Sequence, residues 1–595
     1  MCGFFIELRK KNFLSSRKFF HESSKLISHR GDTPKKSYED KNFRADFYRL
    51  KIIDLSNKGD QPMFDISKRY IINFNGEIYN AKKLLKHIPN IKLKSKCDTE
   101  ILINLFSKYG PKTLDLLEGM FSFVIYDTIE KKCFLARDRF GIKPLYYSDT
   151  QNSLIISSEI KPILKYKSQK KFNYNAFGDF FLLGHLDHGE NTFFDGINSL
   201  EPGNFISISG QNKKKVTYWN IINNFNEDSN EDTMNNLLAE SLNQHLISDK
   251  KIGLFLSGGI DSNALAAYYS KKLNYHMDTY TYDFINNKYG ESFKAKNVAK
   301  QLGLKNLNYK LKPKDIIKQI DDLTETLESP FTSMRLFGVN ALYKKAKENN
   351  LKVVIEGHGG DEMFGGYGYN FFPYLSDKFS NKELEKKFGK KTLQKKMLAK
   401  KNQGQYTTDG TYSLDYEIMN KDFLNLYLKK NEAYSYKHKR NLNNLKKSQL
   451  NDIRYIKLPR MLKYTDRISM KHGIEARVPF LNHKLFSFCF NLPNNKKYNE
   501  EYGSKYLLKK VINNLNLNTK VEKQKQDIVD PQTLWMTKYF KSFFMDNVNS
   551  TNLVFNEIFN KEMVIKRFNN IEKNKKSSFS LFSILTTMIF LKKFE

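Results

Sequence analysis

The pattern of apolar residues changes once along the chain of 595 residues, between about residues 211 and 233. Before this stretch, short apolar and aromatic runs such as YIINFNG, MFSFVIY and SLIISSE are separated by Gly, Asp, Asn and Lys. After it, strand-like apolar runs alternate with helical patterns. The first arrangement predicts antiparallel sheets, and the second predicts a parallel sheet. The polar stretch 211–233 is expected to be irregular, and we place a domain boundary there.

The expected fold therefore has two domains. Residues 2–215 are predicted to form an α+β domain of layered antiparallel sheets flanked by helices, with helical patterns at 81–87 and 99–108. Residues 233–595 are predicted to form an α/β domain with a doubly wound parallel sheet, mainly helical from about residue 371. The Lys-rich region 379–405 and the polar region 430–450 are expected to be solvated helices or loops.

The net charge of +35 raises the alternative of a nucleic-acid-binding protein. However, the lysines are scattered through every segment, and no block combines clustered Arg with interleaved aromatic residues. Compositional bias is the preferred interpretation, and no nucleic-acid partner is expected. If the alternative were correct, binding to oligonucleotides would weaken steeply with salt.

The cysteines and the apolar runs indicate in which cellular compartment the protein is expected. Cys2, Cys97, Cys133 and Cys489 form no CxxC pair, so neither a zinc site nor a disulfide framework is indicated. A reducing cytoplasm is the expected location. The N-terminus shows no signal-peptide pattern. The apolar run SLFSILTTMIFL falls short of the roughly 18 residues that span a bilayer, so it predicts a core helix and no membrane partner.

The first chemical signal is Met1-Cys2-Gly3. Removal of the initiator Met would place the Cys2 thiol beside a free α-amine. Such an amine has a pKa of about 7.7–8.0, so it can act as the general base for its own side chain. Cys2 is therefore a candidate nucleophile.

Further segments follow Cys2 in a recognisable order: MCGFF, FYRLKIIDL, NFNGEIYN, CDTE, LEGMFSFVIYD and ARDRFGIKPLYY. Together they resemble the class II glutamine amidotransferases, which implies an N-terminal-nucleophile fold with glutamine as a partner. The resemblance implies that the Cys2 thiolate attacks the glutamine amide, releases ammonia and leaves a thioester. The Asn75 side chain and the Gly76 backbone N–H would then hold the oxyanion of the tetrahedral intermediate.

The same resemblance implies a set of glutamine-binding residues. Arg49 suits the α-carboxylate as a bidentate partner, Asp98 suits the α-ammonium, and Glu77 lies within the NFNGEIYN match with Asn75 and Gly76. One departure is the sequence HRGD at residues 29–32, where the family commonly has HRGPD.

The second signal is SGGIDS at residues 257–262, between the apolar run IGLFL and a helical pattern. Glycines let the backbone approach phosphate closely, and a helix N-terminus adds N–H donors. The motif resembles the loop of the ATP pyrophosphatases, which implies a nucleotide at the carboxyl ends of the strands. The implied ATP-binding residues are Leu256, Ser257, Gly258, Gly259, Asp261, Ser262, Tyr282, Glu356 and Gly357.

Two more segments extend this resemblance. In EGHGGDEMFGGY, residues 356–367, Asp361 matches a second acidic position, so Asp261 and Asp361 are a candidate Mg²⁺ pair. DRISMKHGIEARVPFLNHKL at 466–485, GSKY at 503–506 and EKQKQDIVDPQTLW at 522–535 resemble segments of the synthetase part. This assigns Lys505 to stabilising an adenylation transition state, with a solvated lysine as the alternative.

Over residues 2–540 the chain thus resembles the glutamine-hydrolysing asparagine synthetases. The resemblance implies ATP and Mg²⁺ as cofactors, a possible homodimer, and amidation of a carboxylate, by default aspartate, through an acyl-adenylate. His358 stands where these enzymes typically have Glu, and Glu356 where a small Ser is common. His358 can still accept a proton as a catalytic group, but the acceptor could instead be another carboxylate, such as a uronic acid of a surface polysaccharide.

Overall fold

The computed structural model describes residues 2–10, 16–167, 170–223, 230–285, 291–389, 416–430, 442–499, 501–515, 517, 531–572 and 577–595. The segment 522–530 and most of the regions 379–405 and 430–450, for which the sequence made predictions, lie outside the described residues. The described part of the Lys-rich region forms helix α14 (Asn381–Phe388), which is mostly exposed, as expected.

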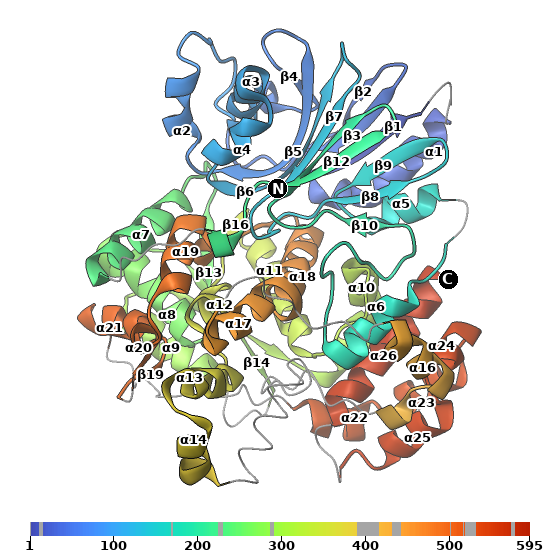
Figure 1. Cartoon of the computed structure of the whole chain (residues 1–595), viewed down its shortest axis with the longest axis vertical. Helices are drawn as coiled ribbons and strands as arrows, with labels where there is room; N and C mark the ends of the chain where they lie inside the picture. Colours follow the sequence, from blue (N-terminus) through green and yellow to red (C-terminus); the bar gives the residue numbers. More distant parts are fainter. Residues whose placement is uncertain are drawn as a thin grey trace.

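Two antiparallel sheets of six strands form the N-terminal domain, in the orders β10-β8-β9-β1-β3-β2 and β12-β11-β7-β6-β5-β4 (Figure 1). Side chains alternate across each strand. Phe4 and Ile6 of β1 therefore pack with Val124 of β6 between the sheets, whereas Phe5 joins the core on the opposite face. The strands are β1 Gly3–Arg9, β2 Lys36–Glu39, β3 Phe43–Tyr48, β4 Met63–Phe64, β5 Tyr70–Ile78, β6 Gly119–Asp127, β7 Cys133–Arg137, β8 Tyr146–Asp149, β9 Ser153–Ser157, β10 Asn198–Ser199, β11 Asn204–Ser209 and β12 Asn212–Thr217.

Helices cover the outer faces of these sheets, as the sequence predicted. The helical patterns at 81–87 and 99–108 correspond to α2 with its 3₁₀ extension and to α3, and the apolar face of α3 packs on β5 and β6. The helices of this domain are α1 Arg17–Ser24, α2 Ala81–Leu84, α3 Asp98–Tyr109, α4 Thr113–Leu116, α5 Ile160–Tyr166 and α6 Tyr174–Gly178.

The described part of the stretch that the sequence suggested to be irregular contains β12, a 3₁₀ turn at Ile221–Asn223 and the start of α7 (Glu231–Gln244). Residues 212–217 form β12, which pairs with β11 on one side and ends its sheet on the other. Its three lysines, Lys213, Lys214 and Lys215, are exposed. Exposed lysines are common on edge strands because they discourage pairing with a further strand. In sequence, such a polar edge strand has the same composition as a linker. The prediction of irregular structure is therefore wrong for residues 212–217, and the strand continues past residue 215.

The C-terminal domain is built on a parallel sheet in the order β15-β14-β13-β16-β17, with helices on its faces (Figure 1). The first strand of the domain, β13, lies between β14 and β16. The chain thus first adds strands on one side of β13 and later on the other side. In doubly wound sheets, ligands bind at the carboxyl ends of the strands where the strand order reverses. The strands are β13 Ile252–Phe255, β14 Thr279–Phe284, β15 Asn306–Leu311, β16 Val353–Ile355 and β17 Glu475–Arg477. The helices up to this last strand are α7 Glu231–Gln244, α8 Ile260–Ala267, α9 Glu291–Gln301, α10 Pro313–Leu327, α11 Arg335–Glu348, α12 Gly360–Phe364, α13 Phe371–Lys378, α14, α16 Lys421–Lys430, α17 Asn444–Asn451 and α18 Leu458–Lys471.

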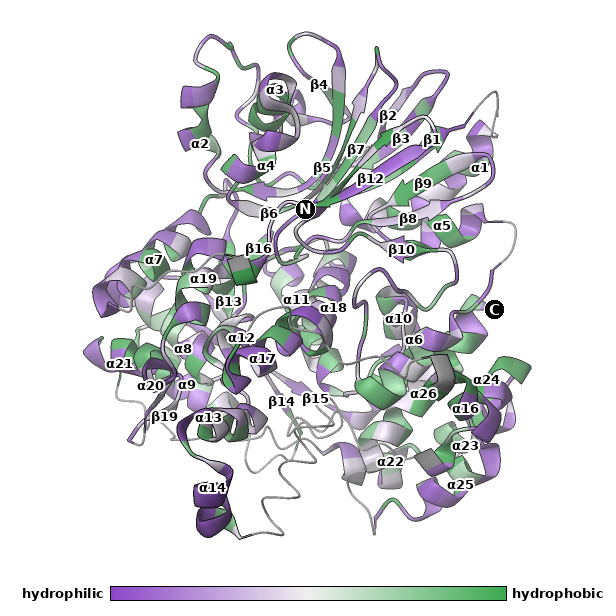
Figure 2. Ribbon diagram, viewed as in Figure 1, coloured by the Kyte–Doolittle hydropathy of each residue, from purple (hydrophilic) through white to green (hydrophobic). Residues whose placement is uncertain are grey.

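The last part of the chain is mainly helical, as predicted. The elements are α19 His483–Asn491, α20 Asn494–Lys497, α21 Tyr506–Asn514, α22 Gln532–Tyr539, α23 Lys541–Asn549, α24 Leu553–Ile558, α25 Lys561–Asn569, α26 Ser577–Phe594 and a short hairpin of β18 Tyr498–Asn499 and β19 Gly503–Ser504. Helix α26, which contains SLFSILTTMIFL, is buried and largely hydrophobic (Figure 2), which confirms the predicted core helix. Within the described residues, every helix is too short or too polar to span a bilayer.

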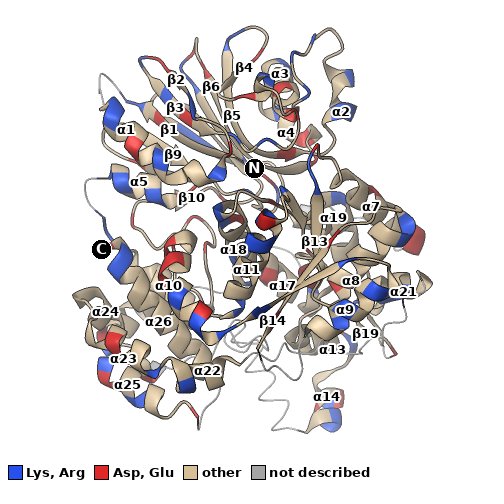
Figure 3. Cartoon of the chain, turned by 180° about the vertical axis from the view of Figure 1, so that it is seen from behind, with Lys and Arg blue, Asp and Glu red and all other residues tan. Residues whose placement is uncertain are grey.

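Charged residues are spread over both domains. In the view from behind in Figure 3, Lys and Arg lie on strands and helices of both halves, with Asp and Glu among them. This agrees with the scattered lysines of the sequence.

A buried group of ion pairs joins the two domains. Arg30, from the HRGD segment, contacts Asp466 of α18 through two bonds of 2.8 and 2.9 Å and Glu159 at 2.9 Å. The next residue of α18, Arg467, donates to Glu328 at 2.8 Å. All five side chains are at most 3% exposed. The contact of Arg30 with Asp466 therefore fixes the interface, whereas Arg30–Glu159 and Arg467–Glu328 each form within one domain.

Replacing Arg30 by Met is expected to destabilise the protein markedly. It removes a cation from between the buried Asp466 and Glu159 carboxylates, which keep Arg467 at 3.2 Å and His29 at 2.9 Å, and breaking a buried ion pair costs about 3–5 kcal/mol. Calorimetry should show a clear fall in melting temperature. Arg69→Met is the control, because Arg69 is 33% exposed where it pairs with Asp127, and exposed pairs contribute about 0–1 kcal/mol. Equal shifts in the two variants would mean that the buried network does not hold the domains together.

Candidate active sites

Cys2 directly precedes β1 and is buried against β5 of the facing sheet. Its backbone N–H donates to Oδ1 of Asn75 at 2.9 Å, and its carbonyl accepts from Nε of Arg30 at 3.0 Å. Burial raises the pKa of the Cys2 thiol, so a base is needed to form the thiolate. The structure thus brings the predicted nucleophile next to Asn75, which is 73 residues away in the chain.

The amide of Asn75 is oriented by this contact. Because the Cys2 N–H requires an acceptor, the oxygen of the amide faces Cys2 and the nitrogen Nδ2 faces away. Nδ2 is buried and has no hydrogen-bond partner among the residues that the structure describes. A buried donor without a partner costs about 1–3 kcal/mol, so it calls for a functional explanation. The neighbouring Gly76 is packed too tightly for a side chain, since a Cβ would lie 2.1 Å from the carbonyl oxygen of Met120.

Two carboxylates, those of Glu77 and Asp98, lie near the C-terminal end of β5. Asp98, at the first turn of α3, accepts hydrogen bonds from the backbone N–H groups of Ile78 and Thr99, both at 2.8 Å. Burial nevertheless raises the pKa of Asp98 to about 6. Burial and the charge of Asp98 raise the pKa of Glu77 as well. These two predicted glutamine-binding residues therefore lie close together in a poorly solvated site.

Arg49 is held by protein groups. Its Nη1 donates to the Ser56 carbonyl at 2.6 Å and to Oδ1 of Asp60 at 3.1 Å, and its Nη2 donates to the Asp54 carbonyl at 2.5 Å. The side chain is 5% exposed. The bidentate contact with a glutamine carboxylate that the sequence suggested stays a prediction.

The C-terminal domain and the segment between β7 and β8 contribute residues to this site that the sequence did not reveal. Arg477 of β17 lies 3.6 Å from Glu77 and donates from Nε to Glu475 at 2.7 Å. Lys143, whose Nζ is 3.5 Å from the Ala476 carbonyl, is buried, and burial lowers its pKa to about 8. The segment EARVPFL matched the family only as a motif. The sequence did offer a signal for these residues, because Glu475 and Arg477 are charged residues within an otherwise apolar run.

The loop of residues 257–262 connects β13 to α8, at the carboxyl end of the parallel sheet. Gly258 has a φ of 81°, which favours glycine, and Gly259 is the N-cap residue of α8. Ser262 closes the loop, because its hydroxyl accepts from the Ser257 N–H and donates to the Gly259 carbonyl. A Cβ on Gly357, from the loop after β16, would be 3.2 Å from Cβ of Asp261. The two glycine-rich loops therefore meet where phosphate binding was predicted.

Lys505 lies between the two predicted metal-binding carboxylates. Its Nζ is 2.5 Å from Oδ2 of Asp261 and 2.6 Å from Oδ1 of Asp361. Lys505 is 5% exposed, so the alternative of a solvated lysine is wrong. Burial opposes its charge, but the two carboxylates outweigh burial and raise the pKa of Lys505. Gly366 makes room for this contact, since a Cβ there would be 2.2 Å from Cε of Lys505.

The donor set at this point fits Mg²⁺. Mg²⁺ is usually held by one or two carboxylates together with substrate phosphates and water. Asp261 and Asp361 provide two carboxylates next to the predicted phosphate loop. Within the described part of the chain, no cluster of three or more His, Cys, Asp or Glu forms an all-protein metal site. The arrangement therefore suits an ion that shares its ligands with a nucleotide.

Three predicted nucleotide contacts lie at the same edge of the sheet. Leu256 follows β13 and is buried, with its N–H bonded to the Tyr280 carbonyl at 2.9 Å. Tyr282 is half-buried on β14, with its ring against Gly338. Glu356 is 4% exposed, and its carboxylate is engaged by other side chains. Its predicted role in binding ATP stays a prediction.

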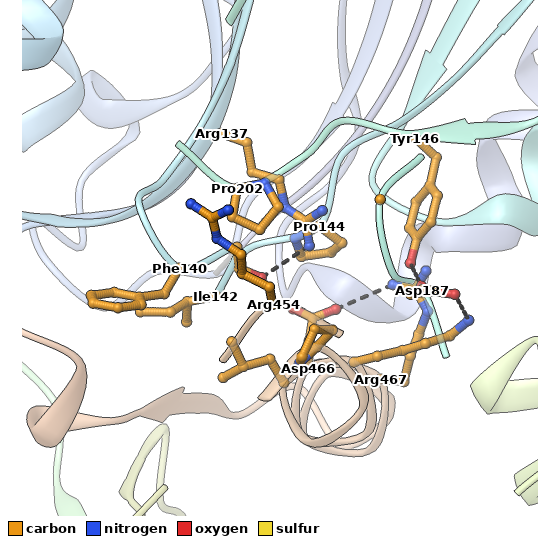
Figure 4. Close-up of a pocket in the computed structure, with 15 residues that line it drawn as sticks. Arg137, Phe140, Ile142, Pro144, Tyr146, Asp187, Pro202, Arg454, Asp466 and Arg467 are labelled. Carbon is orange, nitrogen blue, oxygen red and sulfur yellow. Dashed lines mark hydrogen bonds and ion pairs between the residues drawn. The ribbon is translucent and has the colours of Figure 1, made fainter. Parts of the chain in front are cut away.

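A cavity between the domains lies beside the ion-pair network (Figure 4). Its water-accessible volume is about 20 Å³, and part of it is open to solvent. Its wall combines Pro202 and Tyr146 of the N-terminal domain with Asp466 and Arg467 of α18. Asp187 joins the two sides, because it accepts from the Tyr146 hydroxyl at 2.7 Å and pairs with Lys463 at 2.9 Å.

Comparison with known proteins gives two family matches. A glutamine amidotransferase domain matches residues 1–219, and Asparagine synthase matches residues 233–592. Asparagine synthetase [glutamine-hydrolyzing] 2 of Bacillus subtilis is 30% identical over 517 residues, which cover 82% of this chain and 66% of the relative. Asparagine synthetase [glutamine-hydrolyzing] 1 of the same organism is 25% identical over 90% of this chain and 88% of its own length. Amidase chry2 of Gibberella zeae is 26% identical over 86% of this chain and 84% of its own length.

Proposed function

We infer the reaction from one premise: this chain belongs to the asparagine synthase family, whose members are ATP-dependent, and it is a glutamine-dependent amidotransferase. We propose that residues 2–215 hydrolyse glutamine and that residues 233–595 use the ammonia to convert a carboxylate to an amide. The carboxylate would be activated as an acyl-adenylate.

In the first half-reaction, the Cys2 thiolate attacks the side-chain amide of glutamine. Ammonia leaves, and water then hydrolyses the thioester to glutamate. After removal of Met1, the α-amine of Cys2 would take the thiol proton. The observation that carries this proposal is the buried Nδ2 of Asn75, which has no hydrogen-bond partner among the described residues. With the N–H of Gly76, it would hold the oxyanion, and Arg49, Glu77 and Asp98 would hold the glutamine.

In the second half-reaction, a carboxylate oxygen attacks the α-phosphorus of ATP and pyrophosphate leaves. Ammonia then attacks the acyl carbon, and AMP leaves. The loop at 257–262 would bind phosphate through its backbone N–H groups, and Asp261 and Asp361 would hold Mg²⁺. Bound Mg²⁺ would neutralise phosphate charge. Lys505, held between those carboxylates at 2.5 and 2.6 Å, would offset negative charge that develops on the phosphates.

Two acceptors are considered for this reaction. The names of the two Bacillus subtilis relatives indicate asparagine as a product and therefore aspartate as the first acceptor. A carboxylic acid other than aspartate, such as a uronic acid, is favoured by one observation in this chain: His358 pairs with the buried Glu356 at 2.8 Å and presents a basic group at the site.

The experiment measures pyrophosphate and AMP release by the purified protein with Mg-ATP and glutamine, with and without a carboxylate. Aspartate, succinate and glucuronate are supplied in turn, and the amide is identified by mass spectrometry. We expect pyrophosphate release to depend on one of these carboxylates and to match the amide formed. Glutamine hydrolysis without carboxylate-dependent pyrophosphate release would contradict the synthetase half of the proposal.

A further inference from the structure

We propose that His358, held by Glu356, forms a cationic acceptor-binding group that selects carboxylic acids lacking an ammonium group. This inference rests on the proposed function, since it names the class of acceptor for the same site.

The position of His358 is tightly constrained. It follows β16, between Gly357 and Gly359, at the edge of the sheet where the loop of Asp261 lies. Gly359 has a φ of 99°, and a Cβ there would be 2.5 Å from Cδ2 of Leu481. The loop is therefore packed closely against the segment of Leu481, which follows β17. The His358 side chain remains 28% exposed, so a ligand can reach it.

Glu356 supports the imidazole from the interior. Its Oε1 accepts from the Tyr343 hydroxyl of α11 at 2.5 Å, and its Oε2 accepts from Thr465 Oγ1 of α18 at 3.1 Å. The same Oε2 is 2.8 Å from Nε2 of His358. Burial opposes the ionised form of Glu356, but His358, Tyr343 and Thr465 outweigh burial and lower the pKa of Glu356. A buried carboxylate is therefore fixed behind the ring.

This carboxylate favours the charged imidazole. Burial opposes the imidazolium, but the charge and hydrogen bond of Glu356 outweigh burial and raise the pKa of His358, with Glu362 and Asp261 adding to the effect. Since Nε2 points to Glu356, Nδ1 is the other donor of the ring. Nδ1 has no hydrogen-bond partner within the part of the chain that the structure describes.

The other charged groups around His358 already have partners. Lys505 pairs with both Asp261 and Asp361, and the Tyr367 hydroxyl donates to Glu362 at 2.6 Å. Burial also raises the pKa of Glu362. His358 is thus a cation with a donor available to a ligand. Such a group attracts a carboxylate or hydroxyl oxygen and repels an ammonium group nearby.

The test compares matched acids by calorimetric binding to the full chain in the presence of Mg²⁺ and α,β-methylene ATP. The pairs are succinate against aspartate and adipate against 2-aminoadipate, which differ only in the amine and include no product of the glutaminase site. We expect the acid without the amine to bind at least about ten-fold more tightly in each pair, because like charges are separated by a short distance in a partly buried site. His358→Gln should remove this preference, and His358→Glu should reverse it.

Two further measurements separate selection from a structural role. Glu356→Gln should lower the pKa of His358 in histidine NMR and reduce the preference. His472→Gln is the matched control, because His472 is a half-buried histidine bonded to Asn340 at 2.8 Å, and its replacement should leave the preference unchanged. A wild-type protein that prefers the amine-bearing acids, binds none of the four acids, or shows the same ratio in His358→Gln overturns the proposal.

Acceptor selectivity and the amidation reaction can fail independently in these measurements. Binding is measured without turnover, so a protein that prefers succinate but releases no pyrophosphate would contradict the reaction and leave the selectivity intact. Efficient synthesis of asparagine from aspartate, with tighter binding of aspartate than of succinate, would confirm the reaction and overturn the selectivity.

Discussion

The Cys2→Ala protein is expected to lose glutamine-dependent amide synthesis by a factor on the order of 10³ or more, while synthesis from ammonium salts continues. Removing a nucleophile abolishes the covalent step, and no other described thiol can replace it. Cys133 and Cys489 are buried in the cores of the two domains, and the Cys97 sulfur accepts from Nη2 of Arg49 at 3.3 Å; burial raises the pKa of each of these thiols. The measurement is amide formation with saturating glutamine or ammonium chloride, with pyrophosphate followed in parallel.

Cys133→Ala is the matched control for this variant. Cys133 belongs to β7 of the same domain, where its side chain packs in the core between the two sheets. Its replacement should lower stability slightly but leave both nitrogen sources usable. Equal loss of both activities in Cys2→Ala would contradict the division of labour between the domains. Retained use of glutamine would exclude Cys2 as the nucleophile.

The sequence predicted the two sheet types because side-chain periodicity is a local property. Runs such as MFSFVIY and the alternation of strands with helices determine whether a segment can pair in an antiparallel or a parallel sheet. The same reasoning failed at β12, where Lys213, Lys214 and Lys215 stand on an edge strand. An edge strand with polar side chains and a linker have the same composition, and only pairing with β11 distinguishes them.

The candidate site could be predicted only as a set of separate motifs. The SGGIDS and GGDE segments placed Asp261 and Asp361 at strand ends, and a parallel sheet brings such ends to one edge. Nothing local placed Lys505 between them, because it belongs to a helix start 244 residues after Asp261. In the same way, the contact of Arg30 with Asp466 spans 436 residues and depends on how the domains pack.

Glu356 illustrates a different limit of sequence reasoning. The resemblance assigned it to ATP because it stands where the family often has a small Ser that contacts the nucleotide. The direction of its side chain is determined by Tyr343 and Thr465, which α11 and α18 place behind the loop. The charge of His358 follows from this contact, so the chemistry of the acceptor site could not be read from the motif alone.

Replacing Lys505 by Asn should reduce carboxylate-dependent pyrophosphate release by about 10²–10³-fold, the usual effect of removing one preorganised electrostatic group. Asn is chosen because Lys505 has a φ of 58°, a conformation that Asn tolerates well, so the backbone is preserved and the charge is lost. Glutamine hydrolysis at Cys2 should continue, because that site lies in the other domain. Pyrophosphate release and glutamate formation are measured on the same sample.

The control for this variant is Lys510→Met on the same helix. Lys510 forms an exposed pair with Glu231 at 2.7 Å, and loss of such a pair should change neither rate nor stability appreciably. The structure also allows Lys505 a purely structural role, as a cation that holds Asp261 and Asp361 together. In that case Lys505→Asn would lower the melting temperature, and the folded protein would keep its rate of pyrophosphate release once Mg²⁺ is saturating, because the metal would replace the missing charge. A rate that stays low in saturating Mg²⁺, in a protein with normal glutaminase activity, requires that the Lys505 ammonium itself acts on the phosphates.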